Sequence, residues 1–249
     1  MKKIAMAFLF ISSVFISNAQ DMTVEKIIES YVENTGGREA WMSLKSLKME
    51  AKIEFSGMEL PLSITSTKSG EAATVVNFQG MTFYQGMFDG ETLWGTNQMT
   101  MKAEKGESED TENMKRAKGE FPEALLTYKD LGYTVELEGE DTKEGVECYK
   151  IKMTKKAQLV DGEEKENVVY YYLDKENFVP IMQEQEMLAG QMKGQISQTL
   201  FSDYQEVDGL YFAFSMTQQL EGQDGQEIVI ESVELNPEID KTLFVFPSE

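Results

Sequence analysis

Apolar and polar residues alternate along much of this chain, and the alternation is clearest after Ser46. Every second position of the first run is apolar, at Leu47, Met49, Ala51, Ile53 and Phe55. The same spacing returns in the next run, at Met58, Leu60, Leu62 and Ile64. A period of two predicts strands that bury one face and expose the other, which is typical of an antiparallel sheet.

Turn signals divide the rest of the chain into further short strands. Asp-Gly, the strongest short hairpin signal, begins at Asp89, Asp161, Asp208 and Asp224. We expect strands at residues 74–78, 81–88, 91–96, 98–102, 133–138, 147–154, 168–173, 179–186, 194–204, 210–219 and 227–235. These eleven ranges and the first two runs are too many strands for a flat sheet, so we expect the sheet to curve strongly.

Helical periodicity occurs in three places. Val24, Ile27, Ile28, Tyr31 and Val32 form one apolar stripe, and Gly36-Gly37 ends the helix that carries it. Shorter helices are predicted at 38–44 and 122–131. Residues 103–120 are charged and lack a period, and we expect them to form a solvated loop. The helices are expected to cover the apolar face of the sheet.

Residues 1–19 have the three parts of a secretory signal peptide. Lys2 and Lys3 precede an apolar run over residues 4–16, and Ser17 and Ala19 supply the small residues before a cleavage site. The run is shorter than the roughly 20 residues that a membrane helix needs. We therefore expect a periplasmic protein that is soluble after signal cleavage, with a single domain over residues 20–249.

The composition excludes two classes of partner. Hydrophobic residues make up 41% of the 249 residues, which is enough for a packed core. The formal net charge is −21, so the phosphates of nucleic acids and of anionic lipid surfaces would be repelled. We expect no nucleic-acid partner and no stable membrane insertion.

The side chains that most often perform catalysis or bind metals are scarce. The chain has no histidine, the commonest general base and metal ligand. Its one cysteine, Cys148, lies on the strand face opposite Tyr149 and Ile151, and we expect it to be structural. We find no phosphate-binding glycine loop and no nucleophile elbow. We expect no cofactor, no metal and no enzyme activity; a secreted hydrolase with paired carboxylates is the alternative.

A curved sheet covered by a few helices can enclose an apolar cavity. The chain has 16 methionines, whose flexible thioethers suit surfaces that accept variable apolar partners. The alternative is that these residues fill a packed core. The candidate cavity residues are Met49, Ile53, Phe55, Met58, Leu60, Leu62, Phe83, Trp94, Met99, Met101 and Leu125.

The order of these features resembles the periplasmic lipoprotein carriers of the LolA/LolB-like superfamily. The most specific segment is residues 233–246, VELNPEIDKTLFVF, which looks like that family's closing strand, turn and Leu-Phe docking residues. Residues 172–174 with 179–180, and 201–204 with 209–212, look like its recurring hairpins. The resemblance covers most of the chain after the signal peptide.

The resemblance implies a mainly β fold, an incomplete β-barrel whose helices form a lid over a cavity for acyl chains. It also implies a non-enzymatic carrier or binding protein for a lipid or a lipidated protein. The lipoprotein carriers proper use an arginine on an inward strand position, whereas the arginines here are Arg38 and Arg116. Relatives of this fold bind glycolipids or sense envelope stress, so an envelope protein-interaction or stress-sensor module is the second functional hypothesis.

Overall fold

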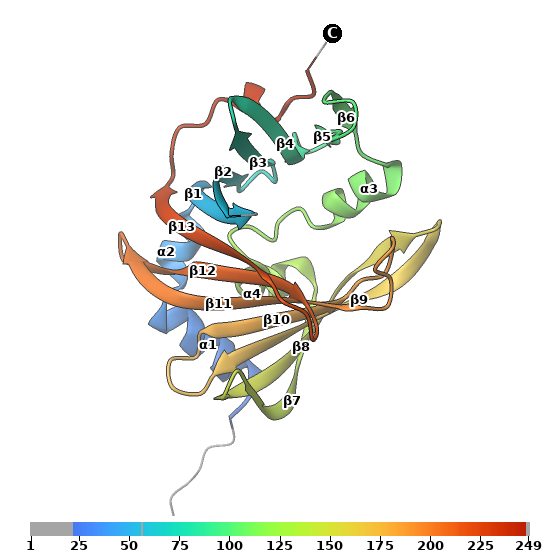
Figure 1. Ribbon diagram of the computed structural model, residues 1–249. Coiled ribbons are helices and arrows are strands. Elements are labelled where there is room, and N and C mark those ends of the chain that lie inside the picture. The colour runs from blue at the N-terminus through green and yellow to red at the C-terminus, as the bar shows by residue number, and fades with distance from the viewer. Residues whose placement is uncertain (1–21, 56, 248–249) are drawn as a thin grey trace, which may run out of the picture.

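The computed structural model describes residues 22–55 and 57–247, apart from the side chain of Phe55. The predicted signal peptide lies outside these residues. Figure 1 shows the described elements in chain order: α1 (Val24–Asn34), α2 (Arg38–Ser43), β1 (Ser46–Phe55), β2 (Met58–Thr67), β3 (Ala72–Phe78), β4 (Met81–Phe88), β5 (Leu93–Thr96), β6 (Ala103–Lys105), α3 (Ser108–Arg116), α4 (Ala124–Leu131), β7 (Thr134–Lys143), β8 (Val146–Val160), β9 (Glu163–Asp174), β10 (Pro180–Glu186), β11 (Ile196–Val207), β12 (Leu210–Leu220), β13 (Gln226–Leu235) and the 3-10 helix η1 (Lys241–Phe244). None of the described helices is both long and apolar enough to cross a bilayer.

All of these strands join one antiparallel sheet, which confirms the predicted mainly β fold. The strand order is β6-β5-β4-β3-β2-β1-β13-β12-β11-β10-β9-β8-β7, so the sheet is open between β6 and β7. Two meanders meet where β1 pairs with β13, with Leu47 opposite Leu235 and Met49 opposite Val233. This pairing carries apolar residues of the early strands onto the same face as those of the last strands.

The main core lies between that face and the helices. Figure 1 shows α1, α2 and α4 on one side of the sheet, behind β9–β12. The predicted stripe of α1 is confirmed, because Ile27 and Ile28 are at most 1% exposed and pack in the same cluster as Leu125 of α4. Ile151 of β8 and Leu62 of β2 belong to the same cluster, so helices and both halves of the sheet share one core.

The end of α1 is fixed against the turn between β11 and β12. Gly36 has φ +119°, and a Cβ there would lie 2.3 Å from the carbonyl oxygen of Gly209. The backbone N–H of Tyr211 donates to the carbonyl of Thr35 at 3.1 Å. Only glycine combines this backbone conformation with so close an approach, so Gly36 does more than stop the helix.

The C-terminal segment covers the other face of the sheet near β3–β5. Phe244 of η1 packs with Ala73, Met87 and Trp94 in a second cluster. The indole N–H of Trp94 donates to the carbonyl of Phe244 at 2.7 Å. The Leu-Phe ending therefore packs on this face, away from the main core and its helices.

Two sequence predictions were wrong in this region. Residues 98–102 form a turn in which the side chain of Asn97 accepts from the N–H groups of Met99 and Thr100, rather than a strand. Residues 103–120 are not a loop, because they contain β6 and α3. Helix α3 has no buried residue and thus no apolar stripe to detect. Its attachment to β8 is polar, through hydrogen bonds that Asn113 exchanges with the backbone of Leu159.

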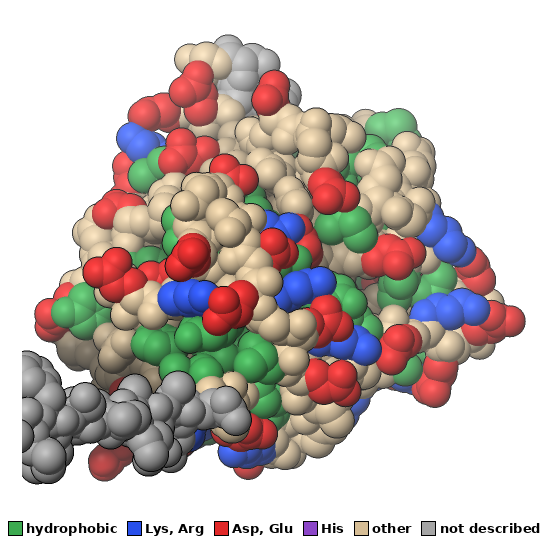
Figure 2. Space-filling view, turned by 90° about the horizontal axis from the view of Figure 1, so that it is seen from below, with side chains coloured by type: hydrophobic (Ala, Val, Ile, Leu, Met, Phe, Trp, Pro, Cys, Tyr) green, Lys and Arg blue, Asp and Glu red, His purple; other side chains and the backbone are tan. Residues whose placement is uncertain are grey.

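The predicted Asp-Gly hairpins are found at β8–β9 and β11–β12. Both residues of each pair have positive φ, at Asp161-Gly162 and at Asp208-Gly209. Such angles match the type I′ turns that follow the twist of antiparallel strands. On the face of the molecule in Figure 2, acidic and basic side chains are interspersed, with the acidic ones in excess as the net charge requires.

Candidate functional site

A hollow of about 170 Å³ lies within the helix-covered side of the sheet, beneath α1. It is lined mostly by aromatic and apolar side chains from α1, α2 and the strands β1, β9, β10, β11 and β12. The lining residues are Tyr31, Trp41, Met49, Glu123, Tyr171, Pro180, Gln183, Phe201, Tyr204, Tyr211, Phe212, Ala213 and Met216. The hollow adjoins the main core, whose side chains are buried.

The polar tips of two aromatic rings in the wall already have hydrogen-bond partners. The indole N–H of Trp41 donates to the hydroxyl of Thr35 at 3.1 Å, and its ring meets Phe212 edge-on at 5.0 Å. The hydroxyl of Tyr204 donates to the carbonyl of Pro180 at 2.7 Å. With these groups satisfied, the rings can present apolar surface to a ligand.

Glu123 is the only carboxylate among the described residues that line this hollow. It stands directly before α4, and its Oε2 accepts a hydrogen bond from the hydroxyl of Tyr31 at 2.9 Å. The other oxygen, Oε1, is buried and has no hydrogen-bond partner. The residue as a whole keeps some exposure, but its carboxylate oxygen Oε1 has essentially none.

Burial dominates the protonation equilibrium of this group. Desolvation penalises the charged form and raises the pKa of Glu123 to about 7, although the hydrogen bond from Tyr31 opposes the shift. The pKa of Tyr31 is raised by the same burial and by the neighbouring charge of Glu123. Near neutral pH the carboxyl group therefore exchanges between its two protonation states.

A second hollow, of about 370 Å³, adjoins the first. Glu123, Tyr171 and Gln183 line both hollows. Met114, residues 117–124, the β2–β3 turn and Lys155 of β8 also line it. Lys155 is paired with Glu120 at 2.7 Å, so the ammonium group has its countercharge within the wall.

The predicted cavity residues fall into several different environments. Met49 lines the smaller hollow. Leu62 and Leu125 are buried in the main core, and Ile53, Leu60 and Phe83 pack partly buried against it. Trp94 belongs to the second cluster, on the other side of the sheet. Met58, Met99 and Met101 are exposed, Met99 by 92%; the side chain of Phe55 lies outside the described residues.

Sequence reasoning missed most of the wall. Tyr31 belongs to the predicted apolar stripe of α1 and Phe212 to a predicted strand, but nothing in the sequence indicates that they border a gap. Glu123 carried no signal, because it is one of 44 acidic residues and precedes a short helix. Glu123 comes to line the hollow only because the fold brings the start of α4 next to α1 and β9.

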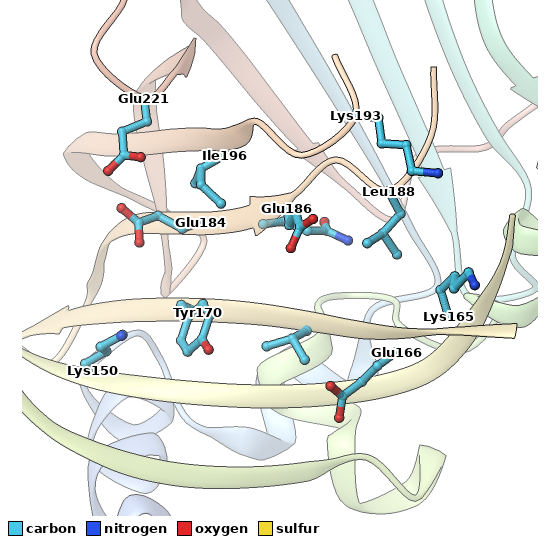
Figure 3. A pocket seen from close by; sticks show the side chains of 12 residues that line it. Lys150, Lys165, Glu166, Tyr170, Glu184, Glu186, Leu188, Lys193, Ile196 and Glu221 are labelled. Carbon is cyan, nitrogen blue, oxygen red and sulfur yellow. The ribbon is translucent and has the colours of Figure 1, made fainter. Parts of the chain in front are cut away.

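A larger hollow of about 610 Å³ is lined largely by charged groups. Figure 3 shows lysine and glutamate side chains around it, including Lys150, Glu184 and Lys193. Glu184 is held by Tyr172 at 2.5 Å, Lys143 at 3.0 Å and Gln198 at 2.8 Å. Lys150 lies 3.0 Å from Glu138, and Lys193 lies 4.0 Å from Asp161. Charged side chains make up most of this wall, so a smaller share of it is apolar than in the smaller hollow.

The remaining reactive groups give no competing site. Cys148 is 0% exposed and packs with Tyr172 and Met182, and burial raises the pKa of its thiol. Among the residues that the structure describes, no cluster of acidic and cysteine side chains could hold a metal ion. Arg38 donates to the carbonyl of Leu126 at 2.9 Å, and Arg116 to that of Ala157 at 2.7 Å. Both arginines thus lie on helices rather than on an inward strand position.

Solved structures resemble this chain over nearly its whole length. A DUF1329 family protein from Desulfovibrio piger superposes with a TM-score of 0.54 at 12% identity, covering 90% of this chain and 97% of its own. A LolA superfamily protein from Nitrosomonas europaea gives 0.52 at 10%, covering 90% and 98%. A Vibrio parahaemolyticus domain assigned to outer membrane lipoprotein sorting gives 0.50 at 11%, covering 88% and 94%. At such identities the similarity shows the fold alone.

No curated protein sequence matches the chain significantly. A family model described as "-like: Uncharacterized protein" matches residues 109–246, which is more than half of the chain. The matched region runs from α3 to the end of η1 and includes Glu123 and the strands β9–β12. The chain therefore belongs to this family, and its fold is that of the LolA/LolB-like superfamily.

Proposed function

We propose that this protein is a non-enzymatic carrier or binding protein that holds the apolar part of a lipid or lipidated protein beneath α1. The observation that carries the proposal is the hollow on the helix-covered side of an open sheet, with a wall of tyrosine, tryptophan, phenylalanine and methionine. Pockets lined by aromatic and apolar groups with few polar ones are typical of sites for apolar ligands. The fold shared with lipoprotein carriers supports this function.

The mechanism needs only burial and a movable cover. Covering apolar surface contributes about 25 cal/mol per Å², so an acyl chain gains affinity in proportion to the length enclosed. The space described is small, so entry of a long chain requires α1 to move outward from the sheet. Release is the reverse movement, and no covalent step is involved.

Few polar contacts tie α1 to the structure it covers. Tyr31 donates to Glu123 at 2.9 Å, and the amide of Asn34 donates to the carbonyl of Asn177 at 2.8 Å. At the C-terminal cap of α1, the carbonyl of Thr35 accepts from the N–H of Tyr211 at 3.1 Å, which holds that end of the helix in place. Along the rest of α1 the contact is apolar packing, through Ile27 and Ile28. Apolar contacts with a ligand can replace such packing, which makes α1 the element suited to act as the lid.

The proposal includes a place of action outside the cytoplasm. The leader over residues 1–19 supports export to the periplasm, where the mature protein would act as one domain over residues 20–249. The partner would be an acyl chain or a lipoprotein. Glu123 is the only carboxylate among the described residues that line the smaller hollow, and Glu71 and Glu120 of the second hollow are each paired with a lysine. This arrangement disfavours a hydrolase of the paired-carboxylate type there.

Mass spectrometry of material extracted from protein purified from the periplasm tests the proposal. We expect a lipid or acylated species near one equivalent per chain in the wild type, and a strongly reduced amount when Met49→Trp fills the hollow. Absence of apolar material, together with no saturable binding of acyl probes by the extracted protein, would reject the carrier function.

A further inference from the structure

The polar group inside the hollow is the strongest unexplained feature of the interior. Oε1 of Glu123 is buried without a partner, whereas Oε2 accepts from Tyr31. A buried polar atom without a hydrogen bond costs free energy that the fold must offset elsewhere. Because Glu123 lines both hollows, a ligand that occupies either of them passes this oxygen.

The groups that face Glu123 leave its negative charge largely uncompensated. Tyr31 from α1, Tyr171 from β9 and Tyr204 from β11 surround it, and each is neutral at physiological pH. The described residues that line the smaller hollow include no lysine or arginine. The two lysines that line the second hollow already have carboxylate partners, because Lys155 pairs with Glu120 and Lys118 lies 3.4 Å from Glu91.

We propose that Glu123 recognises a protonated amine on the apolar ligand, which donates a hydrogen bond to Oε1. This inference rests on the proposed function and names its ligand class, an amphiphile with a cationic amine close to an aliphatic chain. An ammonium group supplies both the missing donor and the missing countercharge. A hydroxyl supplies only the donor, and an ionised carboxylic acid would be repelled.

The dimensions suit such a ligand. At about 30 Å³ per methylene- or water-sized group, the smaller hollow takes roughly five or six groups. The amine would sit at Glu123, where the two hollows meet, and a chain longer than this needs the outward movement of α1 proposed above. The polar head is then inside the protein at Glu123, instead of projecting into solvent from the mouth of the cavity.

Titration calorimetry with three ligands of equal chain length tests the inference: dodecylamine and dodecanoic acid below their micelle concentrations, and dodecanol below its solubility limit. Near pH 8 we expect the amine to bind about tenfold more tightly than the alcohol, because only the amine forms a charge-assisted hydrogen bond with Glu123. The acid is expected to bind most weakly. Equal affinities would overturn the inference while leaving the carrier function standing; no binding of any of the three would count against the carrier function itself.

Matched variants separate Glu123 from the general acidity of the protein. In Glu123→Gln the preference for the amine over the alcohol is expected to disappear, while dodecanol still binds. Glu29→Gln removes the same charge from an exposed position on α1 and is expected to keep the preference. Loss of the preference in both variants would mean that overall charge attracts the amine, which contradicts recognition by Glu123.

The pH dependence gives an independent readout. Pairing with an ammonium requires the ionised form of Glu123, whose pKa in the empty protein is about 7, whereas an alkylamine stays protonated below its pKa of about 10. The affinity for dodecylamine is therefore expected to rise as the pH increases from 6 to 8. A flat profile in the wild type, or the same rise in Glu123→Gln, would overturn the assignment.

Discussion

Two buried carboxylates show how differently the same side chain behaves in two surroundings. Burial raises the pKa of Glu123 to about 7, with one hydrogen bond in opposition. Burial also acts on Glu71, but hydrogen bonds from Ser69, Thr67 and Lys241 outweigh it and lower the pKa to about 2. The first carboxylate faces the interior hollow, whereas the second joins the β2–β3 turn to η1. We therefore assign ligand recognition to the first and stability to the second.

The stability of the protein is expected to fall with rising pH because of Glu123. Its folded pKa of about 7 exceeds the ordinary value of 4.5, so its favourable contribution is complete below pH 4.5 and lost as the pH rises through 7. Glu123→Gln cannot ionise and should be more stable than the wild type near pH 8, by about 1–3 kcal/mol. Urea melts at several pH values measure this; a variant less stable at pH 8, or a gap that does not shrink toward pH 5, would contradict the account.

Glu71 is expected to behave in the opposite sense. Its pKa is depressed, so its contribution is present above the ordinary value of 4.5 and lost as the pH falls toward 2. Glu71→Gln should lower the free energy of unfolding at neutral pH by about 1–3 kcal/mol, because the charge-assisted hydrogen bonds are lost. The difference from wild type in urea melts should close below pH 4.5. A gap of constant size across that range would show that ionisation of Glu71 contributes nothing.

At the scale of elements, the sequence identified those whose pattern follows from burial. The alternation along β1 and β2 and the stripe of α1 were readable because one face meets the core and the other meets water. Helix α3 could not be read in this way, because polar groups attach it. Glu109 accepts from the N–H groups of Asp161 and Gly162, and Asn113 exchanges hydrogen bonds with Leu159. Such contacts depend on where β8 lies, which a local pattern does not contain.

The attachment of α3 can be tested at Asn113. Replacing it by alanine leaves the N–H and the carbonyl of Leu159 without these side-chain partners, at a cost of about 1–3 kcal/mol. Asn113→Ala is expected to increase amide hydrogen exchange in α3 and at the β8–β9 turn. Glu112→Ala, at a side chain that is 51% exposed on the same helix, should leave exchange at that turn unchanged. Equal protection in Asn113→Ala and the wild type would disprove the anchoring role.

Two tryptophan substitutions on neighbouring strands distinguish hollow from core. Leu62 of β2 is 5% exposed within the main core, so Leu62→Trp should overpack it and cost about 1–3 kcal/mol. Met49 of β1 lines the hollow, so Met49→Trp should be nearly neutral in the empty protein and should weaken acyl binding. Urea melts and probe titrations on both variants measure the pair. An equal loss of stability in the two would mean that the gap near Met49 cannot accept added volume.

At the scale of the whole molecule, the order of the strands creates the site. Pairing of β1 with β13 joins the two meanders, so residues distant in sequence, such as Met49 and Phe212, line one hollow. The strand number and the one-sided patterns predicted a strongly curved sheet with a helical cover, and the family resemblance added that the sheet does not close into a barrel. The sequence identified few of the residues that line the hollow, because alternation shows which side chains point inward but not where their packing leaves a gap. Met49 was among the predicted residues, whereas Glu123 and the tyrosines around it were not.

The central claim is that an apolar chain binds beneath α1, and the two tryptophans of the protein allow a direct measurement. Trp41 lines the hollow, and Trp94 packs in the second cluster on the other side of the sheet. An acyl probe brominated along its chain quenches a tryptophan that it contacts. With Trp94→Phe, which leaves only Trp41, we expect saturable quenching; with Trp41→Phe, which leaves only Trp94, we expect almost none. Quenching of Trp94 alone, equal quenching of both, or no saturable quenching would contradict binding in this hollow.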